Sequence, residues 1–178
     1  MQTLDANKSL FQCFKTKLGW VIVCYGEQGI RRLSFGHKTS YDAQRYLESW
    51  ANQFDVQLKQ SRSKDDITER LVRFSEGEPD TFQDIAIELP KMTPFQLAVT
   101  NTCRSIPYGQ KLTYGEVAEM CDSPRAARAV GNVMRNNPIP LIVPCHRVVG
   151  CNGGLGGFSS PQGTNMKQKL LDMEAQHI

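Results

Sequence analysis

The sequence predicts an α+β protein in which residues 1–90 form a small antiparallel sheet with helices and residues 91–178 form a mainly helical domain. Three observations support this class. Short segments rich in aromatic and β-branched residues, separated by glycine turns, fill the first 35 residues. Helical periodicity with capping residues begins at Thr93. Pro90 and the two residues after it form an expected linker, and a chain of 178 residues has room for two domains.

Three strands are expected at the N-terminus, arranged as an antiparallel meander. Residues 10–16 and 20–25 are rich in Phe, Val, Ile, Tyr and Cys and are separated by a turn at Gly19. Residues 30–35 form a third apolar run after a second glycine turn. Strands joined by such short glycine turns pair with their neighbours, which predicts one small sheet.

Helices and one further strand should follow the meander. Ser40 is the expected N-cap of a helix. The apolar residues of this helix recur at three- and four-residue steps and form one stripe: Ala43, Tyr46, Leu47, Trp50 and Phe54. The polar residues 57–64 are typical of a loop, and residues 66–75 of a short helix. Alternating isoleucine and leucine over residues 85–89 predict a strand.

The second part is expected to be helical. Its first helix has Thr93 as N-cap and Pro94 at its first position. One apolar face continues until Pro107 and comprises Phe95, Ala98, Val99, Cys103 and Ile106. Two further helices, the first capped by Thr113 and the second spanning about residues 123–136, are joined by a tight turn. This arrangement is typical of a helix-turn-helix.

The second helix of this pair separates an apolar face from a cationic one. At about 100° per residue, one arc of about 100° holds Ala126, Val130, Val133 and Met134. A separate arc of about 80° holds Arg125, Arg128, Asn132 and Arg135. A solvated basic face is the simplest interpretation. However, the helix contains no acid to pair with these arginines, and small residues beside them would let a nucleic-acid strand approach. The small residues are Ala126, Ala127, Ala129 and Gly131.

Charge and hydropathy exclude several classes of protein. Residues 1–90 carry 12 basic and 13 acidic side chains, whereas residues 91–178 carry 9 and 5, so a nucleic-acid surface would lie in the second part. No apolar segment approaches the roughly 18 residues of a membrane helix, and the N-terminus lacks the basic start of a signal peptide. We therefore expect a cytoplasmic protein, or a nuclear one in a eukaryote.

The cysteines and histidines favour free thiols over disulfides or a metal site. The six cysteines show no Cys-x-x-Cys pair and no regular close spacing, which is typical of a reducing compartment. Cys13, Cys24 and His37 offer three potential zinc ligands, but the only other histidines that could supply a fourth ligand are His146 and His177. No metal site is therefore expected.

Cys145 is the candidate nucleophile. It lies in the segment Pro144-Cys145-His146-Arg147, where nearby positive charge would lower the thiol pKa below its usual value of about 8.5. Neighbouring residues on an extended strand point to opposite faces, so a base that acts through one water is easier to arrange than direct contact with His146. The alternative is that Cys145 is a buried small hydrophobe, as most free cysteines are.

Three motifs resemble the O6-alkylguanine-DNA alkyltransferase family, also called the methylated-DNA–protein-cysteine methyltransferases. The segment IPYGQKLTYGEVA at 106–118 is similar to the family's helix-turn-helix entry. RAVGNVMRNNPIP at 128–140 is similar to its recognition helix and asparagine hinge, and PCHRVVG at 144–150 to its active-site motif. The resemblance extends from about Thr93 to the C-terminus.

The resemblance implies a fold, a reaction and a partner. Residues 1–90 would be a ribonuclease-H-like structural domain, and residues 91–178 a DNA-binding and alkyl-transfer domain with a winged helix-turn-helix. Cys145 would take a methyl or other alkyl group from O6 of guanine, and from O4 of thymine, without a cofactor and only once per molecule. The partner would be double-stranded DNA carrying O6-alkylguanine, bound by a monomer through the minor groove, with no membrane and no obligate protein partner.

The resemblance also implies roles for residues around Cys145. His146 would be the general base acting through a water, and Glu174 would orient it. Tyr114 would donate a proton or hydrogen bond to N3 of the departing guanine. Asn137 would hold the turn between the recognition helix and the active-site strand. The plainer alternatives are a core aromatic for Tyr114 and a solvated helix-end charge for Glu174.

The implied DNA contacts centre on Arg128, which would enter the base stack where the target nucleotide leaves it. Small residues would fit the helix into the minor groove, where binding is nearly sequence-independent and salt-sensitive. The DNA surface would comprise Arg125, Ala126, Ala127, Arg128, Ala129, Gly131 and Arg135. The substrate pocket would comprise Arg147, Val148, Phe158 and Ser159, with a mobile glycine-rich rim at 153–157. Two residues depart from the family's usual alanine and tyrosine, namely Val133 and Phe158.

Three other functions account for parts of the sequence. A non-catalytic alkyltransferase-like protein would share the fold and DNA surface but lack the cysteine, so Cys145 argues against it. A transcriptional regulator would use the helix-turn-helix but leaves the Cys145 motif and Tyr114 unexplained. A cysteine hydrolase would need an oxyanion hole and a direct Cys–His contact, which nothing in the sequence identifies.

Overall fold

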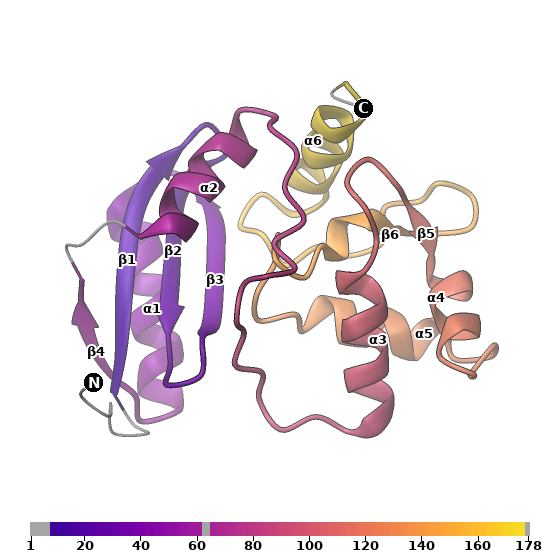
Figure 1. Cartoon of the computed structure of the whole chain (residues 1–178), viewed down its shortest axis with the longest axis horizontal. Helices are drawn as coiled ribbons and strands as arrows, with labels where there is room; N and C mark the ends of the chain where they lie inside the picture. The colour runs from indigo at the N-terminus through magenta and orange to yellow at the C-terminus, as the bar shows by residue number, and fades with distance from the viewer. Residues whose placement is uncertain (1–7, 62–64, 177–178) are drawn as a thin grey trace. The chain divides into compact units, whose positions relative to one another are not determined.

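The computed structural model describes residues 8–61 and 65–176, which divide into two compact units (Figure 1). Within the described residues, the first unit extends to Glu78 and includes Ile85–Pro90. The second unit comprises Pro79–Asp84 and the residues from Lys91 onward. Strands and helices occur in both units, so the predicted α+β class is confirmed.

The first unit is built on a four-stranded sheet in the order β3-β2-β1-β4. The strands are β1 (Lys8–Thr16), β2 (Gly19–Tyr25), β3 (Ile30–His37) and β4 (Gln57–Gln60). The first three pair antiparallel, which confirms the predicted meander. Gly19 turns the chain from β1 to β2 at φ +104, and a Cβ there would lie 2.8 Å from the carbonyl oxygen of His37. Only glycine fits this turn without strain.

Two predictions in the first unit were wrong. Residues 57–60 form strand β4 rather than a loop, and this strand pairs parallel with β1. Apart from Leu58, which packs against the core, its side chains are polar, because β4 is an edge strand that is mostly exposed. The strand expected over residues 85–89 is reduced to one bridge between Ile30 and Ile87. Residues 62–64 of the expected loop lie outside the described part of the chain.

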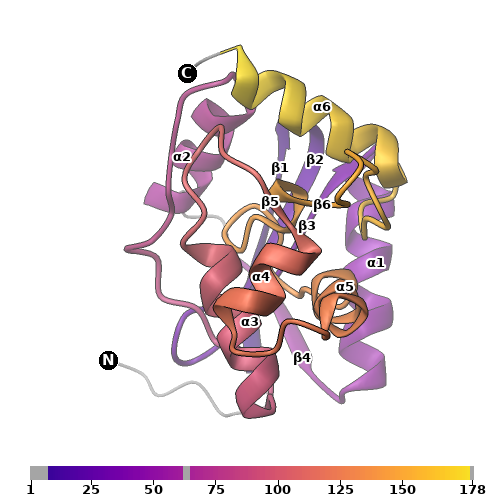
Figure 2. The ribbon, with the colours of Figure 1, turned by 90° about the vertical axis from the view of Figure 1, so that its right-hand side faces the viewer.

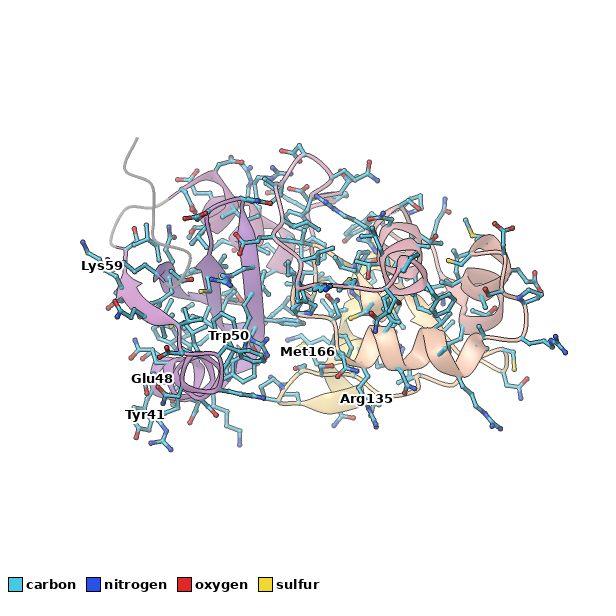
Figure 3. The ribbon with its side chains drawn as sticks, turned by 90° about the horizontal axis from the view of Figure 1, so that it is seen from below. Tyr41, Glu48, Trp50, Lys59, Arg135 and Met166 are labelled. Atoms are coloured by element: carbon cyan, nitrogen blue, oxygen red, sulfur yellow. The ribbon has the colours of Figure 1, made fainter. Side chains whose placement is uncertain are left out.

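Helices α1 (Ser40–Gln53) and α2 (Asp66–Ser75) lie on opposite faces of this sheet (Figures 1 and 2). The N-cap of α1 is Thr39 rather than the expected Ser40, because Thr39 and Asp42 form a capping box. Ala43 and Leu47 are buried as predicted, but Phe54 is 57% exposed because it follows the last turn of the helix. Trp50 packs against the sheet, whereas Tyr41 projects from the outer side of α1 (Figure 3).

The second unit gathers α3 (Pro94–Arg104), α4 (Tyr114–Met120) and α5 (Ala127–Arg135) around a two-stranded parallel sheet (Figure 2). This sheet pairs β5 (Leu112–Thr113) with β6 (Val148–Val149). A 3₁₀ turn, η1 (Cys145–Arg147), precedes β6, and α6 (Gly163–Ala175) packs against η1. Thr93 and Thr113 cap α3 and α4 through capping boxes, as expected from their positions.

Helix α5 is shorter than the sequence suggests. It begins at Ala127 rather than at Ser123, and its N-cap, Ala126, offers no side chain that can accept a hydrogen bond. The preceding residues form turns instead: Ser123 N donates to Ala118 O at 2.9 Å, and Ala126 N donates to Ser123 O at 2.8 Å. Asp122 adopts φ 53, in the left-handed region, and this turns the chain away from the axis of α4 before α5 begins. None of the helices in the described ranges has the length and apolar character needed to span a membrane.

Candidate functional site

A loop held by hydrogen bonds of the Asn137 side chain carries the chain from α5 to Cys145. The side chain of Asn137 donates from Nδ2 to Val143 O at 2.7 Å and accepts from Ile139 N at 3.0 Å. Leu141 lies between these contacts at φ 74, in the left-handed region that non-glycine residues rarely adopt. A strained backbone conformation of this kind persists only where surrounding contacts hold the chain in place. The loop is therefore held in one conformation by the Asn137 amide.

Cys145 opens η1 and is 3% exposed. The expected extended strand is absent here, because Cys145 N donates to Val143 O and Arg147 N donates to Pro144 O, which closes a tight turn. The expected fall in the pKa of Cys145 was also wrong: burial raises the pKa, and a hydrogen bond from Asn137 and the charge of Lys167 offset only part of this rise.

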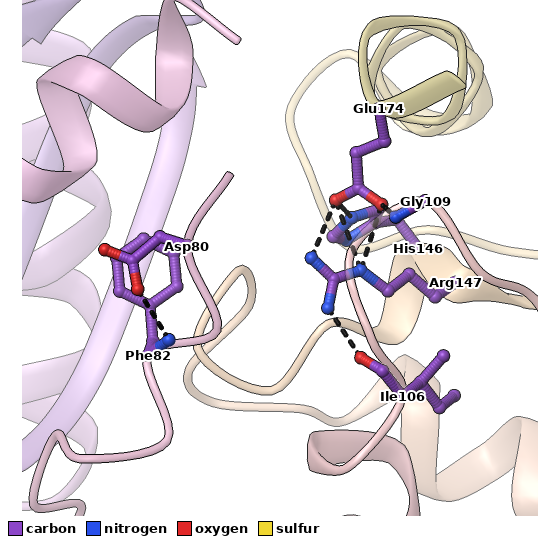
Figure 4. Close-up of polar contacts among 7 residues, drawn as sticks. All are labelled: Asp80, Phe82, Ile106, Gly109, His146, Arg147 and Glu174. Carbon is purple, nitrogen blue, oxygen red and sulfur yellow. Dashed lines mark hydrogen bonds and ion pairs between the residues drawn. The ribbon is translucent and has the colours of Figure 1, made fainter. Parts of the chain in front are cut away.

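His146, the second residue of this turn, forms a buried pair with Glu174 of α6 (Figure 4). Nε2 of His146 lies 2.8 Å from Oε1 of Glu174. Burial alone would raise the pKa of Glu174, but hydrogen bonds and charge from His146 and Arg147 hold it at about 2. An ionised carboxylate only accepts hydrogen bonds, so Nε2 of His146 carries the hydrogen.

The other ring nitrogen of His146 is therefore the basic one. Nδ1 is buried and has no hydrogen-bond partner among the described residues. Burial also lowers the pKa of His146, which keeps the imidazole neutral near pH 7. A neutral imidazole with a free Nδ1 lone pair can accept a proton from a neighbouring thiol or from a water beside it.

Arg147 binds the carboxylate of the His146–Glu174 pair and does not line a pocket. Its guanidinium donates to Glu174 from Nε at 3.0 Å and from Nη2 at 2.9 Å, and Nη1 donates to Ile106 O at 2.7 Å (Figure 4). Gly109 N completes the shell of Glu174 at 3.0 Å. The Arg147 side chain is 2% exposed and committed to these partners, so it does not serve the substrate-pocket role expected from the sequence.

Lys167 is a residue that the sequence analysis missed. It is fully buried, and its Nζ donates to Val148 O at 2.6 Å and lies 3.5 Å from the Tyr114 hydroxyl. A seven-residue spacing on α6 places it on the same helix face as Glu174, and this spacing is the signal that the sequence contained. The same helix face thus contributes a buried cation and a buried carboxylate.

An open pocket of about 730 Å³ lies between α4, α5 and the loop after β6. Tyr114, Arg128, Arg135, Cys151 and Gly156 are among its lining residues. Ala127 and Gly131 of the expected DNA surface also line it. The remaining members of that surface, Arg125, Ala126 and Ala129, lie at or beside the exposed start of α5.

The other residues expected in the substrate pocket, Val148, Phe158 and Ser159, differ in their surroundings. Val148 is buried, and its carbonyl bonds Lys167. The Ser159 hydroxyl donates to Arg135 O, which ties the loop to the end of α5. Phe158 is half-buried. The glycine-rich rim at 153–157 is tied to the end of β6, because Gly150 N donates to Gly154 O at 2.6 Å.

The cysteines and the zinc candidates of the first unit do not gather. All six cysteines, each within the described residues, are free thiols. His37 bonds the Ser34 hydroxyl through Nε2 at 2.8 Å. His177 lies outside the described part of the chain. Across residues 8–61 and 65–176, no three potential metal ligands come together.

Fold and site together define a protein with a buried cysteine, a histidine–glutamate pair next to it in the fold, and two short helices that pack against each other. Residues 94–176 match the family described as the DNA-binding domain of 6-O-methylguanine DNA methyltransferase. A methylated-DNA–protein-cysteine methyltransferase from Methanosarcina acetivorans is 35% identical over 166 residues, which cover 92% of this chain and 97% of the relative. The constitutive enzyme of that name from Bacillus subtilis is 32% identical, over 90% of this chain and 92% of the relative.

A solved structure shares the fold over both units. The crystal structure of Mycobacterium tuberculosis OGT in complex with DNA matches with a TM-score of 0.74 and 27% identity, and covers 94% of each chain. The relatives and the matching domain agree on one family. The chain belongs to the methylated-DNA–protein-cysteine methyltransferase family.

Proposed function

We propose that this protein repairs DNA by taking a methyl or other alkyl group from O6 of guanine, and from O4 of thymine, onto Cys145. The thiolate sulfur forms a bond to the alkyl carbon, the bond between that carbon and O6 breaks, and its electron pair returns to the guanine. The proton lost by the thiol replaces the alkyl group on the base, so the products are guanine and a thioether. Because the thioether is stable, each molecule acts once.

The observation that carries this proposal is the free Nδ1 of His146. It is buried next in sequence to Cys145, and its tautomer is set by the ionised Glu174. A base held in this state can take the thiol proton directly or through one water. Because burial raises the pKa of Cys145, the thiol needs such a base to become a thiolate. A non-catalytic lesion-binding protein would not need such a base.

The surroundings of Tyr114 support its role as a hydrogen-bond donor to the departing guanine. It lines the 730 Å³ pocket, and burial together with the neighbouring thiols Cys145 and Cys103 raises its pKa. The phenol therefore keeps its proton and can donate a hydrogen bond to N3 of the base as negative charge develops there. Val148, Phe158 and Ser159 would complete the surroundings of the flipped base.

We infer that α5 is the helix that contacts DNA, because exposed arginines lie beside small residues at its start. A solved relative from Mycobacterium tuberculosis is described in complex with DNA. Arg125 and Arg128 are exposed at its start, and Arg128 lines the pocket. The small residues Ala126, Ala127, Ala129 and Gly131 would let this helix enter the minor groove. Arg128 would fill the space left by the flipped nucleotide, and Arg135 would extend the cationic edge.

The proposal extends to the organisation of the chain. We propose a structural role and a ribonuclease-H-like topology for residues 1–90, supported by an antiparallel meander whose fourth strand is parallel to β1. Residues 91–178 would form a winged helix-turn-helix domain that binds DNA and accepts the alkyl group. We propose a monomer that acts in a reducing compartment such as the cytoplasm, because Cys145 must stay reduced to react.

The test is intact-protein mass spectrometry after incubation with a duplex that contains O6-methylguanine. We expect a gain of one methylene mass in the wild type and in Cys151→Ala, which removes the exposed thiol that lines the pocket. We expect no gain in Cys145→Ala. DNA binding without any mass gain in the wild type would contradict the proposal.

A further inference from the structure

The turn between α3 and β5 contacts both members of the buried ion pair formed by Arg147 and Glu174. Ile106 O accepts a hydrogen bond from Nη1 of Arg147 at 2.7 Å, and Gly109 N donates to Oε2 of Glu174 at 3.0 Å. Between these two residues of the turn, the ring centre of Tyr108 lies 5.6 Å from Cζ of Arg147. This short segment thus offers a carbonyl and an aromatic face to the cation, and an N–H group to the anion.

The same turn covers the ion pair on a side that reaches the surface. Arg147 and Glu174 are each 2% exposed, whereas Tyr108 is only half-buried. Gln110 N donates to Pro107 O at 3.2 Å, which closes the turn around Tyr108 and restricts where its ring can lie. Because an ion pair shielded from water is held more strongly, a cover over Arg147 also restrains the carboxylate of Glu174.

The position of Arg147 matters for the base because Arg147 and His146 bind the same carboxylate oxygen. Oε1 of Glu174 accepts from Nε2 of His146 at 2.8 Å and from Nη2 of Arg147 at 2.9 Å. If the guanidinium moves, this oxygen moves with it, and the hydrogen bond to His146 becomes longer or bent and therefore weaker. The tautomer of His146 thus depends on how firmly Arg147 is held.

We propose that Tyr108 is a positioning residue for alkyl transfer: its ring holds the guanidinium of Arg147 against Glu174, and this keeps the carboxylate in line with Nε2 of His146. An aromatic ring attracts a cation through its electron-rich face, and the attraction is larger where the cation is shielded from water. Tyr108 is not among the residues that line the pocket of about 730 Å³, so it acts through Arg147 and Glu174 and not on the substrate.

This inference rests on the proposed function, but its first test needs no DNA. Tyr108→Phe keeps the aromatic face over Arg147, whereas Tyr108→Leu removes it. Tyr41→Leu is the matched control, since Tyr41 is a 65% exposed tyrosine of the first unit whose ring centre lies 6.0 Å from Cζ of Arg45. The ring nitrogens of His146, assigned by comparison with His146→Gln, would be observed by NMR in the full-length protein.

We expect the wild type, Tyr108→Phe and Tyr41→Leu to carry the hydrogen of His146 on Nε2 and none on Nδ1. In Tyr108→Leu the two tautomers should be mixed, so the resonances of both nitrogens should move toward each other. Methyl transfer to Cys145 in Tyr108→Leu should be slower by about tenfold near pH 7, with unchanged affinity for duplex DNA, because the base is correctly oriented for only part of the time. A folded Tyr108→Leu protein with the wild-type tautomer and rate would overturn the proposal.

A graded replacement of the ring is informative even if Tyr108→Leu does not fold. Phenylalanine and its singly, doubly and triply fluorinated forms would be incorporated at position 108, which keeps the shape of the ring and weakens its negative face step by step. The rate of methyl transfer should fall in the same order. Equal rates across the series would show that the ring only fills space, and would overturn the proposal. Absence of methyl transfer from DNA in the wild type would instead refute the proposed function and leave the NMR result standing.

Discussion

The carboxylate of Glu174 accepts a 2.8 Å hydrogen bond from Nε2 of His146, although the two residues are 28 positions apart in the chain. This contact joins α6 to η1 and assigns the hydrogen of the imidazole to Nε2, which leaves a free lone pair on Nδ1. Arg147 shares the same carboxylate and so aligns it. The acid–base properties of the site thus depend on a helix at the end of the chain.

Replacing Glu174 by Gln should slow methyl transfer by about 10²–10⁴-fold, because the neutral amide no longer holds His146 in the required tautomer. The loss of charge also leaves Arg147 unpaired, at a cost of about 3–5 kcal/mol in the free energy of unfolding. Asp172→Asn on an exposed position of α6 is the control for both measurements. Single-turnover rates within twofold of the wild type for Glu174→Gln would refute the orienting role.

The free energy of unfolding should decrease as the pH falls below about 4.3, the ordinary pKa of Glu in an unfolded chain. The pKa of Glu174 is lowered to about 2 in the folded state, so its contribution is complete above the unfolded pKa and is lost as the pH approaches 2. His146 acts in the same direction at higher pH, because its folded pKa lies below its ordinary value. Urea titrations from about pH 7 to 2 measure both effects, and Glu174→Gln should flatten the lower window.

Asn137→Ala should cost more stability and activity than Asn136→Ala, its neighbour. The Asn137 side chain makes two hydrogen bonds that span the strained loop at Leu141, and their loss should cost about 1–3 kcal/mol. The Asn136 side chain makes one bond, to Asn132 O at an exposed helix end. Urea unfolding and methyl-transfer rates compare the two. Similar losses in both variants would exclude a special role for Asn137.

Arg128→Ala should slow repair of O6-methylguanine in duplex DNA far more than reaction with free O6-benzylguanine. The free base needs no extrusion from a duplex, whereas a flipped nucleotide leaves a gap that Arg128 is proposed to fill. Arg125→Ala, an exposed arginine before the helix, should weaken duplex binding in a salt-dependent way without changing this ratio. Equal slowing of both substrates by Arg128→Ala would show that Arg128 does not act in flipping.

Gly156→Ala should slow transfer because it displaces the Tyr114 phenol. A Cβ on Gly156 would lie 2.5 Å from the Tyr114 hydroxyl, and the backbone there has φ +63. Gly154→Ala is the matched control, since a Cβ at that position meets nothing within 4 Å. The two variants are compared by single-turnover rates at equal stability. If they react at the same rate, the close approach of Gly156 to Tyr114 does not matter for transfer.

Local signals predicted many elements correctly, and they failed where tertiary partners decide. Capping residues such as Thr93 and Thr113 act on the next turn of the chain, so their helices were correctly predicted. The edge strand at 57–60 was missed because its mostly polar residues do not indicate a strand. Hydrogen bonds to β1 hold it in the extended conformation. Helix α5 starts later than its periodicity suggests, because the turn from α4 uses residues 121–126.

Residue type and short spacing were enough to predict the α+β class, the antiparallel meander and the family, and to indicate Cys145 as the candidate nucleophile. The electrostatics of Cys145 depend instead on contacts between segments that are far apart in the chain. Burial raises the thiol pKa where adjacent basic residues suggested a fall, Glu174 neutralises Arg147, and Lys167 brings its charge from a distant helix. Burial and charge pairing depend on which segments meet in space, and that information is absent from the spacing of residues around Cys145.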